Sequence, residues 1–428
     1  MVKRSKLFRR SSVPVCSIRD LSDELLIKIL SFLPTKVAVS TSILSKQWRF
    51  LWMWLPSLEY SSCLHSYHSN SSALGEFIDK NLPLHRAPVI ERLCLDLVDR
   101  HIQPEDIKRW VEIAVSRYVR DLDILYCSKG DNVFPTSFYT CSSLVMLKLS
   151  RVTIVAVPST ACLASLKTLR LRCLTYEHDD SLQGLLDMCP ALEDLSVKFG
   201  GEHSMGEITF VVLTLQRLSL FLADEWDFDG YVIDTPSLKY FKLVDWNYGR
   251  HDIEIKDMPK LEEAYVDVVS SFLKSVIGSI TSVKHLTICS ELKHMKQCVC
   301  KENSSDLLGQ LLKDSPNLRL LDISHMEDHG DDERNEMVCW NQPSPVPECL
   351  LWSLQTLNWS RYFGRPQERD IAVYILKHAR RLKKARIIAD TQEHDVPNLK
   401  MITELAFSSR ASSRCELVFV KGPRVRRR

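Results

Sequence analysis

The chain has 428 residues, a formal net charge of +2, and 45% hydrophobic and 26% charged residues. At roughly 100–200 residues per domain, this length predicts two to four domains or one repeat array. The small net charge gives no overall basis for binding nucleic acid or a membrane surface. No run reaches the roughly 18 apolar residues that span a bilayer, and no signal peptide is visible.

The cysteines and the two chain ends bear on localisation. The fourteen cysteines are scattered singly along apolar runs such as "LRLRCL" and "HLTICS", which favours reduced core thiols over a disulfide framework. Residues 1–15 and 422–428 are basic and are predicted to be disordered tails, with a nuclear import signal as the alternative. We therefore expect a protein of the nucleus and/or cytoplasm.

Residues 16–58 are predicted to form three helices. In "IRDLSDELLIKILSFL" the apolar residues recur at helical spacing, Asp20 or Ser22 can cap the first turn, and Pro34 ends the helix. Thr35 can cap a second short helix. A third helix is expected from near Ser45 to just before Pro56.

The third segment, "ILSKQWRFLWMW" (43–54), is apolar on more than one side. One stripe consists of Leu44, Trp48, Leu51, Trp52 and Leu55, and Phe50, Met53 and Trp54 lie off it. Such a helix must be buried on several sides, yet a unit of about 40 residues barely supports its own core. The surplus predicts packing on the rest of the chain and on a protein partner. Internal packing of all the aromatic residues remains the alternative.

This segment resembles the F-box of plant F-box proteins, through its Leu-x-Asp-Glu-Leu-Leu start, "ILSFLPTK" and "LSKQWRFLW". The resemblance implies docking on a Skp-type adaptor, which connects the protein to a cullin-based ubiquitin ligase. The positions implied to face the adaptor are Leu21, Leu25, Ile29, Leu33, Pro34, Trp48 and Trp52. The family usually has Leu-Pro where this chain has Leu21-Ser22, which predicts weaker adaptor binding.

Residues 85–326 repeat the pattern apolar-x-x-apolar-x-apolar ten times, from Ile90/Leu93/Leu95 to Leu318/Leu321/Ile323. Most first positions are 22–29 residues apart, the spacing of leucine-rich repeats. Intervening stretches such as 179–190 and 304–318 have helical periodicity. A strand followed by a helix in each repeat predicts a solenoid, although the Asn or Cys usual after each strand is mostly absent.

The stretch 165–197 resembles the repeats of plant F-box proteins. The concave strand face of such a solenoid is a common binding surface, and its predicted solvent-facing residues are basic. They are Lys167, Arg170, Lys239, Lys242, Lys284, His285 and Arg319. They predict a protein-target surface, and an ordinary solvated face is the alternative.

The C-terminal part begins with an acidic loop, residues 327–342. In residues 343–421 the order "VPECL", "SLQTLNW", "YILKHARRLKKARI", "SRCELVF" resembles the FBD domain that ends many plant F-box proteins. Leu354/Leu357/Trp359 and Leu382/Ala385/Ile387 continue the strand pattern. We expect this module to extend and cap the array, because repeat ends need covers.

No catalytic pattern is visible. Glycine is scarce, and neither a phosphate-binding loop nor a GxSxG elbow is present. Cys289, His294, Cys298 and Cys300 lie close in sequence, but their spacing is not that of a zinc site. His178, Asp179 and Asp180 suit a turn that caps the next helix. We predict no metal site, no cofactor and no enzymatic activity.

The predicted fold class is α/β: a three-helix F-box, a leucine-rich-repeat solenoid and a C-terminal α/β FBD module. The predicted function is the substrate-recognition subunit of an SCF-type E3 ubiquitin ligase, with no nucleic-acid or membrane partner. A non-degradative interaction scaffold with a weakened F-box is the alternative. A small-molecule co-receptor is a third possibility and would need a deep polar pocket on the concave face.

Overall fold

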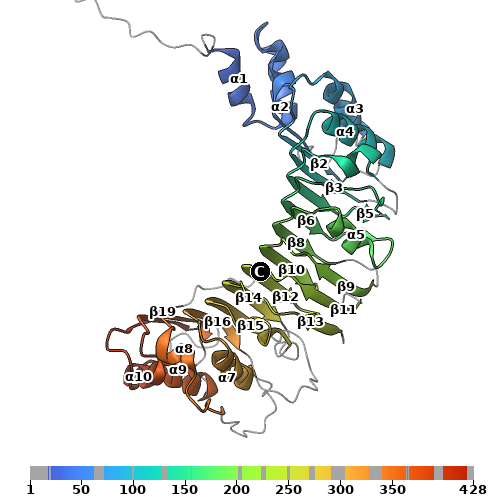
Figure 1. Ribbon diagram of the computed structural model, residues 1–428. Helices are drawn as coiled ribbons and strands as arrows, with labels where there is room; N and C mark the ends of the chain where they lie inside the picture. The colour runs from blue at the N-terminus through green and yellow to red at the C-terminus, as the bar shows by residue number, and fades with distance from the viewer. Residues whose placement is uncertain are drawn as a thin grey trace, which may run out of the picture.

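The computed structural model describes residues 18, 21–61, 72–98, 101–127, 133–155, 157–200, 205–222, 228–247, 251–268, 275–290, 304–326, 340–362, 364, 366–389 and 399–421. The chain forms a curved array with the N-terminal helices at one end and the C-terminal helices at the other (Figure 1). The predicted tails and residues 327–339 of the predicted acidic loop lie outside the described residues. Among the described residues, no helix is long and apolar enough to cross a membrane.

The N-terminal unit contains two α-helices, α1 (Asp23–Leu30) and α2 (Thr35–Ser40), as predicted. The predicted third α-helix is wrong. The chain instead forms two 3₁₀ helices, η2 (Thr41–Ile43) and η3 (Trp48–Trp54). Of the predicted apolar stripe, Trp48, Leu51, Trp52 and Leu55 are buried, whereas Leu44 lies between the two short helices and is exposed. The tighter 3₁₀ turn changes which residues share a face.

The two predicted helix caps differ from expectation. Ser22 occupies the N-cap position of α1, but its hydroxyl makes no capping hydrogen bond, and Asp20 lies outside the described residues. Pro34, not Thr35, is the N-cap residue of α2. The Thr35 hydroxyl instead accepts a hydrogen bond of 2.7 Å from the Glu59 backbone amide. Thr35 therefore ties the helical unit to the first strand of the sheet.

One sheet of fourteen strands lines the inner side of the curve, and all its neighbouring strands run parallel (Figure 1). In order, its strands are β1 (Ser57–Ser61), β2 (Arg92–Leu97), β3 (Asp121–Tyr126), β4 (Met146–Ser150), β6 (Thr168–Arg172), β8 (Asp194–Lys198), β10 (Arg217–Leu222), β12 (Tyr240–Asp245), β14 (Glu263–Val268), β15 (His285–Ser290), β16 (Leu320–Met326), β17 (Thr356–Tyr362), β18 (Lys384–Ala389) and β19 (Glu416–Lys421). Each predicted repeat contributes one strand. The C-terminal module continues the same sheet, and β1 was not predicted.

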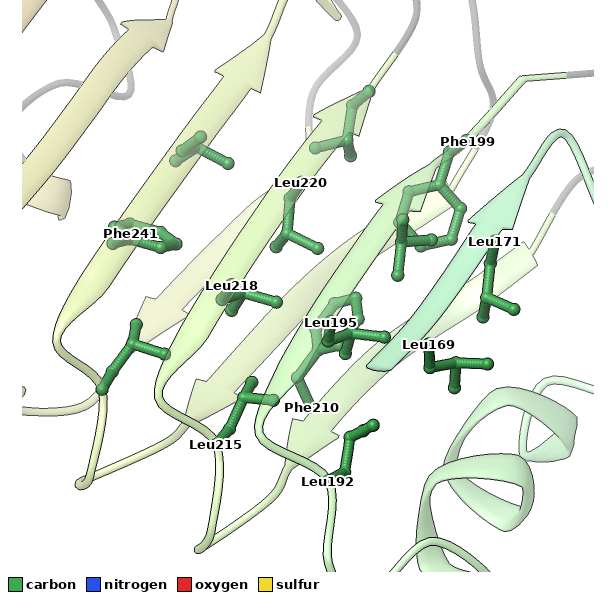
Figure 2. Close-up of a cluster of buried hydrophobic side chains, with 14 of the residues drawn as sticks. Leu169, Leu171, Leu192, Leu195, Phe199, Phe210, Leu215, Leu218, Leu220 and Phe241 are labelled. Carbon is green, nitrogen blue, oxygen red and sulfur yellow. The ribbon is translucent and has the colours of Figure 1, made fainter. Parts of the chain in front are cut away.

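Alternate residues of these strands form the core. Leu169, Leu195, Leu218 and Phe241 are neighbours in register from β6 to β12, and all are fully buried. Figure 2 shows these side chains in one continuous layer, with Phe210 from an outer strand pointing into it. Because each strand is covered by its neighbours, no single repeat can bury its apolar face alone.

Helices cover the outer side at both ends of the array. They are α3 (Ser72–Asn81), α4 (Pro104–Ser116) and α5 (Ser181–Asp187) near the N-terminus, and α7 (Ser304–Asp314), α8 (Glu348–Trp352), α9 (Pro366–His378) and α10 (Leu399–Ala406) near the C-terminus. Two further 3₁₀ helices, η5 (Leu82–Leu84) and η6 (Thr136–Thr140), and a strand pair, β5 (Thr153–Ile154) and β7 (Thr175–Tyr176), complete the connections. The predicted helices α5 and α7 are confirmed.

In the middle of the array the expectation of a helix in each repeat is wrong. Three parallel strands cover the outer side there: β9 (Met205–Val211), β11 (Phe228–Asp234) and β13 (Asp252–Ile255) (Figure 1). In β9 the side chains of Met205, Ile208 and Phe210 are buried. In β9 and β11, buried and exposed side chains nearly alternate, as expected for strands with one buried face. In addition, repeats of about 23 residues leave few residues for a helix between successive strands.

A buried histidine lies at the joint between the helical unit and the array. His85 Nε2 donates a hydrogen bond of 2.7 Å to the Leu55 carbonyl oxygen, and Arg117 donates one of 3.0 Å to the His85 carbonyl oxygen. The other ring nitrogen, Nδ1, is buried and has no hydrogen-bond partner among the described residues. Burial is the main cause that lowers the pKa of His85; the bond to Leu55 opposes it, and the Arg117 charge adds to it.

We expect acid to loosen this joint. Since the folded chain disfavours a proton on His85, the unfolded chain takes up more protons once the pH falls below about 6.5, the ordinary histidine value. The contribution of His85 to stability is therefore present above that pH and lost as the pH falls through the folded pKa. Thermal melting followed by circular dichroism from about pH 7.5 to about pH 5.5 should show this loss. It should be smaller in His85→Gln, whereas exposed His178→Gln serves as the control; an unchanged pH dependence in His85→Gln would contradict the assignment.

Candidate adaptor and target interfaces

Helix α1 has one buried and one exposed apolar face. Leu26 and Leu30 are fully buried against the N-terminal unit, whereas Leu25 is 50% and Ile29 is 39% exposed. Leu33, in the turn after the helix, is also exposed, and Leu21 and Pro34 are partly buried. The four-residue spacing of Leu25 and Ile29 places both on one side of α1. Five of the seven predicted adaptor-facing residues are therefore accessible.

Exposed apolar side chains are concentrated in this part of the molecule. Of the nineteen exposed large hydrophobic residues among those described, ten lie within residues 18–60. About a tenth of the chain thus carries half of these side chains, which is unusual for a surface that faces only water. Besides Leu25, Ile29 and Leu33, they are Ile18, Phe32, Val37, Ile43, Leu44, Phe50 and Trp54.

Two predicted contact residues are placed differently. Trp48 and Trp52 are only 8% and 5% exposed, because both pack into the chain's own core. They support the unit from inside and are not available to a second molecule. Phe50 and Trp54 of the same 3₁₀ helix are the exposed aromatic residues. Position relative to the apolar stripe did not identify them, because Met53 lies off the stripe and is buried, whereas Leu44 lies on the stripe and is exposed.

The predicted basic target residues separate into two sets. Lys167, Lys239 and Lys284 lie one residue before their strands, at the edge of the sheet, and each reaches a side chain of a neighbouring repeat. Lys167 pairs with Glu193 and Lys284 with Glu262, both at 2.8 Å, and Lys239 donates to Gln216 at 3.1 Å. Arg319 occupies the equivalent exposed position before β16. The charges of Lys167 and Lys284 are therefore already compensated by carboxylates, whereas Lys239 contacts a neutral amide.

Arg170 and Lys242 lie on the inner face of the sheet, in one row joined by Ser196 and Ser219. His285, the first residue of β15, is exposed on the same face. Beside this row is a hollow of about 860 Å³, whose four cationic residues are Arg151, Arg172, Lys198 and Lys242. We call it the basic hollow. Three of its four cations were not predicted, although Arg172 follows Arg170 at the alternate-residue spacing that the strand pattern implies.

Comparison with known proteins matches all three parts of the chain. Residues 18–60 match the F-box domain, and residues 342–387 match the FBD. Residues 107–323 match the family model for the LRR repeats of FBD-associated F-box protein At5g56370. The chain is 57% identical to FBD-associated F-box protein At5g38590 of Arabidopsis thaliana over 91% of its own length and 97% of that protein. It is 40% identical to Putative F-box/FBD/LRR-repeat protein At5g62970 of the same plant, over 93% and 98% of the two chains.

The chain belongs to the plant FBD-associated F-box family of leucine-rich-repeat proteins. Its three parts are an F-box, a leucine-rich-repeat region that forms the long parallel sheet, and an FBD. The predicted family and fold class are thus confirmed. As an F-box/LRR protein it is consistent with an SCF substrate-recognition subunit, and F-box family proteins are typically non-catalytic subunits of ligases. The F-box implies binding of a Skp-type adaptor.

Two other sequence clusters of this F-box protein are the Cys289–Cys300 segment and the 178–180 turn. Among the described residues, no group of three or more His, Cys, Asp and Glu side chains is placed to hold a metal ion. Cys289 lies in β15, while His294, Cys298 and Cys300 lie outside the described residues. In the 178–180 turn, Asp179 Oδ1 accepts a hydrogen bond of 3.0 Å from the Gly206 amide. That contact ties α5 to β9 and is structural.

Proposed function

We propose that this protein is the substrate-recognition subunit of an SCF-type E3 ubiquitin ligase. The exposed face of α1, with Leu25, Ile29 and the following Leu33, docks on a Skp-type adaptor, and the leucine-rich repeats hold a protein target. The observation that supports this most is the concentration of exposed apolar side chains in residues 18–60. Such a patch on an otherwise polar surface is typical of a protein–protein interface.

The proposed mechanism is proximity. The F-box and the repeat array are joined by hydrogen bonds. The Arg86 backbone amide donates to the Met53 carbonyl oxygen at 2.7 Å, and the Thr35 hydroxyl accepts from the Glu59 backbone amide. A target held on the array is therefore kept near the adaptor and the ubiquitin-charged enzyme beyond it. This raises the effective concentration of a target lysine without any covalent step on this chain.

The test is affinity purification of the full chain and of a variant lacking residues 1–60, with proteasome activity blocked. We expect the adaptor and the cullin to be lost with the truncation, and the target to be retained if the array folds without the F-box. A circular dichroism spectrum and melting curve of the truncated chain check that condition. Failure of the full chain to capture any Skp-type adaptor would refute the proposal.

A non-degradative scaffold is the second candidate, because Ser22 stands where the family usually has proline. Ser22 is exposed, its φ of −68° and ψ of 157° are those that proline adopts, and it starts α1. Its hydroxyl helps lower the pKa of the Glu24 carboxyl, after the larger effect of the Glu24 backbone amide. The backbone at position 22 is thus compatible with proline, and the difference from the family is the missing contact of a proline ring with the adaptor.

We expect Ser22→Pro to strengthen adaptor capture by about 3- to 10-fold, the range for one added apolar contact of about 1 kcal/mol. The dissociation constant measured by biolayer interferometry with a purified Skp-type adaptor checks this. Ser22→Ala is the control, since it removes the hydroxyl without adding the ring. Equal affinities for the three proteins would mean that Ser22 does not weaken the F-box.

We further propose that the protein acts in the nucleus and/or cytoplasm. The basic ends, residues 1–15 and 422–428, are the candidate import signals. Imaging of fluorescent fusions in plant cells, with each end deleted in turn, tests this. A fusion confined to another compartment would contradict the proposal. An unchanged nuclear fraction after both deletions would show that the two basic ends are not import signals.

A further inference from the structure

The basic hollow lies on the inner face of the sheet, over the C-terminal ends of neighbouring strands from β4 to β12. Arg172 of β6 and Lys198 of β8 are direct neighbours in register, and Phe221 of β10 follows in the same row. Arg151 comes directly after β4, and Lys242 lies in the adjacent row on β12. Four cations from four of five successive repeats thus converge on one concavity.

Among the described residues, these four cations lack the carboxylate partners that other basic residues of the sheet have. Lys148 lies 3.6 Å from Asp123, and Arg217 lies 3.9 Å from Asp194. In the described part of the chain, no such ion pair reaches Arg151, Arg172, Lys198 or Lys242. No carboxylate of the described residues neutralises their positive charge, which is therefore available to a bound molecule.

Two of the cations are held in place by aromatic rings. Lys198 Nζ lies 4.7 Å from the centre of the Phe221 ring, and Lys242 Nζ lies at the same distance from the Tyr265 ring. The edge of Trp246 packs against Phe221, with their ring centres 5.4 Å apart. Such contacts limit the freedom of a long side chain, so that less entropy is lost when it binds an anion.

The lining of the hollow also indicates the shape of its ligand. Its wall contains apolar surface from Leu125, Phe221 and Val244, and hydroxyl groups from Ser196 and Ser219. The volume of about 860 Å³ is in the upper part of the range of ligand pockets. A single small anion would leave the apolar wall uncovered. A peptide that carries carboxylates beside apolar side chains satisfies both parts.

The rim of the hollow argues against a nucleic-acid strand. Asp123 of β3 lies on the inner face on one side, and Asp267 of β14 lies on the other. A phosphate backbone that runs along the sheet would leave the four cations of the hollow at β3, where Lys148 and Arg92 are already paired with Asp123, whereas a short peptide segment ends before that point. The net charge of +2 likewise provides no extended positive track.

We propose that the basic hollow binds an acidic segment of the target protein, with its carboxylates against Arg172 and Lys198 and an apolar side chain against Phe221. This inference rests on the proposed function, since the target is the one that the repeats hold. Arg172 supplies the planar fork that recognises a carboxylate with two hydrogen bonds. The hollow therefore selects targets by an acidic motif.

Fluorescence anisotropy tests the inference with the full chain, purified with a Skp-type adaptor. The probe is a fluorescein-labelled peptide of alternating glutamate and leucine, and its counterpart has glutamine in place of glutamate. We expect the glutamate peptide to bind and the glutamine peptide not to bind, and we expect added salt to weaken the binding of the glutamate peptide. The double variant Arg172→Met/Lys198→Met should weaken binding by about 10-fold or more, which is the range for charge-assisted hydrogen bonds.

The matched control is Lys313→Met, which removes an exposed lysine of α7, outside the hollow and outside the predicted target residues. It should change binding by less than about 2-fold. Equal binding of the two peptides, or an equal effect of the control, would overturn the inference. So would displacement of the peptide by equimolar inorganic phosphate, because that result indicates a small-anion site.

The outcome is separable from the proposed function. All these variants keep residues 18–60 intact, so each should capture the adaptor as the unmodified chain does. If adaptor capture persists while the glutamate peptide fails to bind, the acidic-motif inference is wrong and the ligase assignment stands. If adaptor capture itself is absent in the full chain, the ligase assignment is wrong whatever the peptide does.

Discussion

The double variant Leu25→Glu/Ile29→Glu is expected to lose capture of the Skp-type adaptor almost completely, while the rest of the protein stays folded. Both side chains are exposed on one side of α1, so a charge there disturbs no core contact. In a complex the same charges would be buried without partners, which is costly. Hot-spot residues each contribute about 2 kcal/mol or more, so affinity should fall by about 100-fold or more.

Pull-down and biolayer interferometry with a purified adaptor measure this loss, and the melting temperature checks the fold. Val211→Glu/Leu213→Glu is the matched control, because these two exposed apolar residues lie outside the F-box near β9. The control should bind the adaptor normally. Adaptor capture that survives the α1 substitutions would mean that the exposed face of α1 is not the interface.

Trp48→Ala is expected to behave differently from the α1 variant. Because Trp48 is buried inside the F-box, its truncation should lower the melting temperature as well as adaptor capture. The contrast between the two variants separates a contact residue from a supporting residue. Loss of adaptor capture by Trp48→Ala without any loss of stability would show that Trp48 touches the adaptor after all.

The second large effect is expected from Asp245→Ala in the middle of the array. The Asp245 carboxylate is fully buried at the end of β12 and holds three groups. It accepts hydrogen bonds from the Tyr231 hydroxyl at 3.2 Å and the Asn247 backbone amide at 3.1 Å, and it lies 3.0 Å from His251 Nε2. Burial is the main cause that raises the pKa of Tyr231 well above its ordinary value, and the Asp245 charge adds to it. The phenol therefore stays a protonated donor.

Without the carboxylate, the Tyr231 hydroxyl, the Asn247 amide and His251 Nε2 lose their shared partner. Loss of one partner of a buried charged network costs about 3–5 kcal/mol, so we expect a destabilisation of that size. Urea unfolding followed by circular dichroism measures it. Since repeat arrays can unfold in parts, hydrogen exchange should show the loss first in β9, β11 and β13, which Asp245 joins to the main sheet.

Asp234→Ala is the control for this effect. Asp234 also lies on the outer sheet and pairs with Lys256 at 3.4 Å, but the Asp234 and Lys256 side chains are 30% and 53% exposed to water. Such a surface pair contributes about 1 kcal/mol or less. If Asp245→Ala destabilises the protein no more than Asp234→Ala, the buried cluster is not a structural anchor.

The repeat pattern shows how much of the fold can be predicted from local spacing. All three apolar positions of each predicted repeat, such as Leu215, Leu218 and Leu220, are buried, the first just before the strand and the other two within it. Their period is imposed by the strand and by the stacking of equal units, so it survives in the sequence even where the usual Asn or Cys is absent. The outer layer follows no such constraint, and there strands β9, β11 and β13 replace the expected helices.

The candidate site shows the opposite case. The sequence indicated that residues 43–54 contain more aromatic surface than one small unit can bury, and exposed Phe50 and Trp54 fit this expectation. It did not indicate which aromatic residues would be left over. Periodicity assigns residues to the face of an assumed α-helix, but η3 is a 3₁₀ helix that packs against α1 and the joint with the array.

The amino-acid sequence by itself determined the order of the three parts, the strand of each repeat and the F-box at the N-terminus, because these depend on local spacing and on motifs a few residues long. Only the tertiary structure decided that Trp48 and Trp52 are enclosed, that Lys167, Lys239 and Lys284 are paired at the sheet edge, and that Arg172 and Lys198 share a hollow with Lys242. The reason is physical: exposure and charge compensation depend on neighbours one repeat away, about 22–26 residues along the chain.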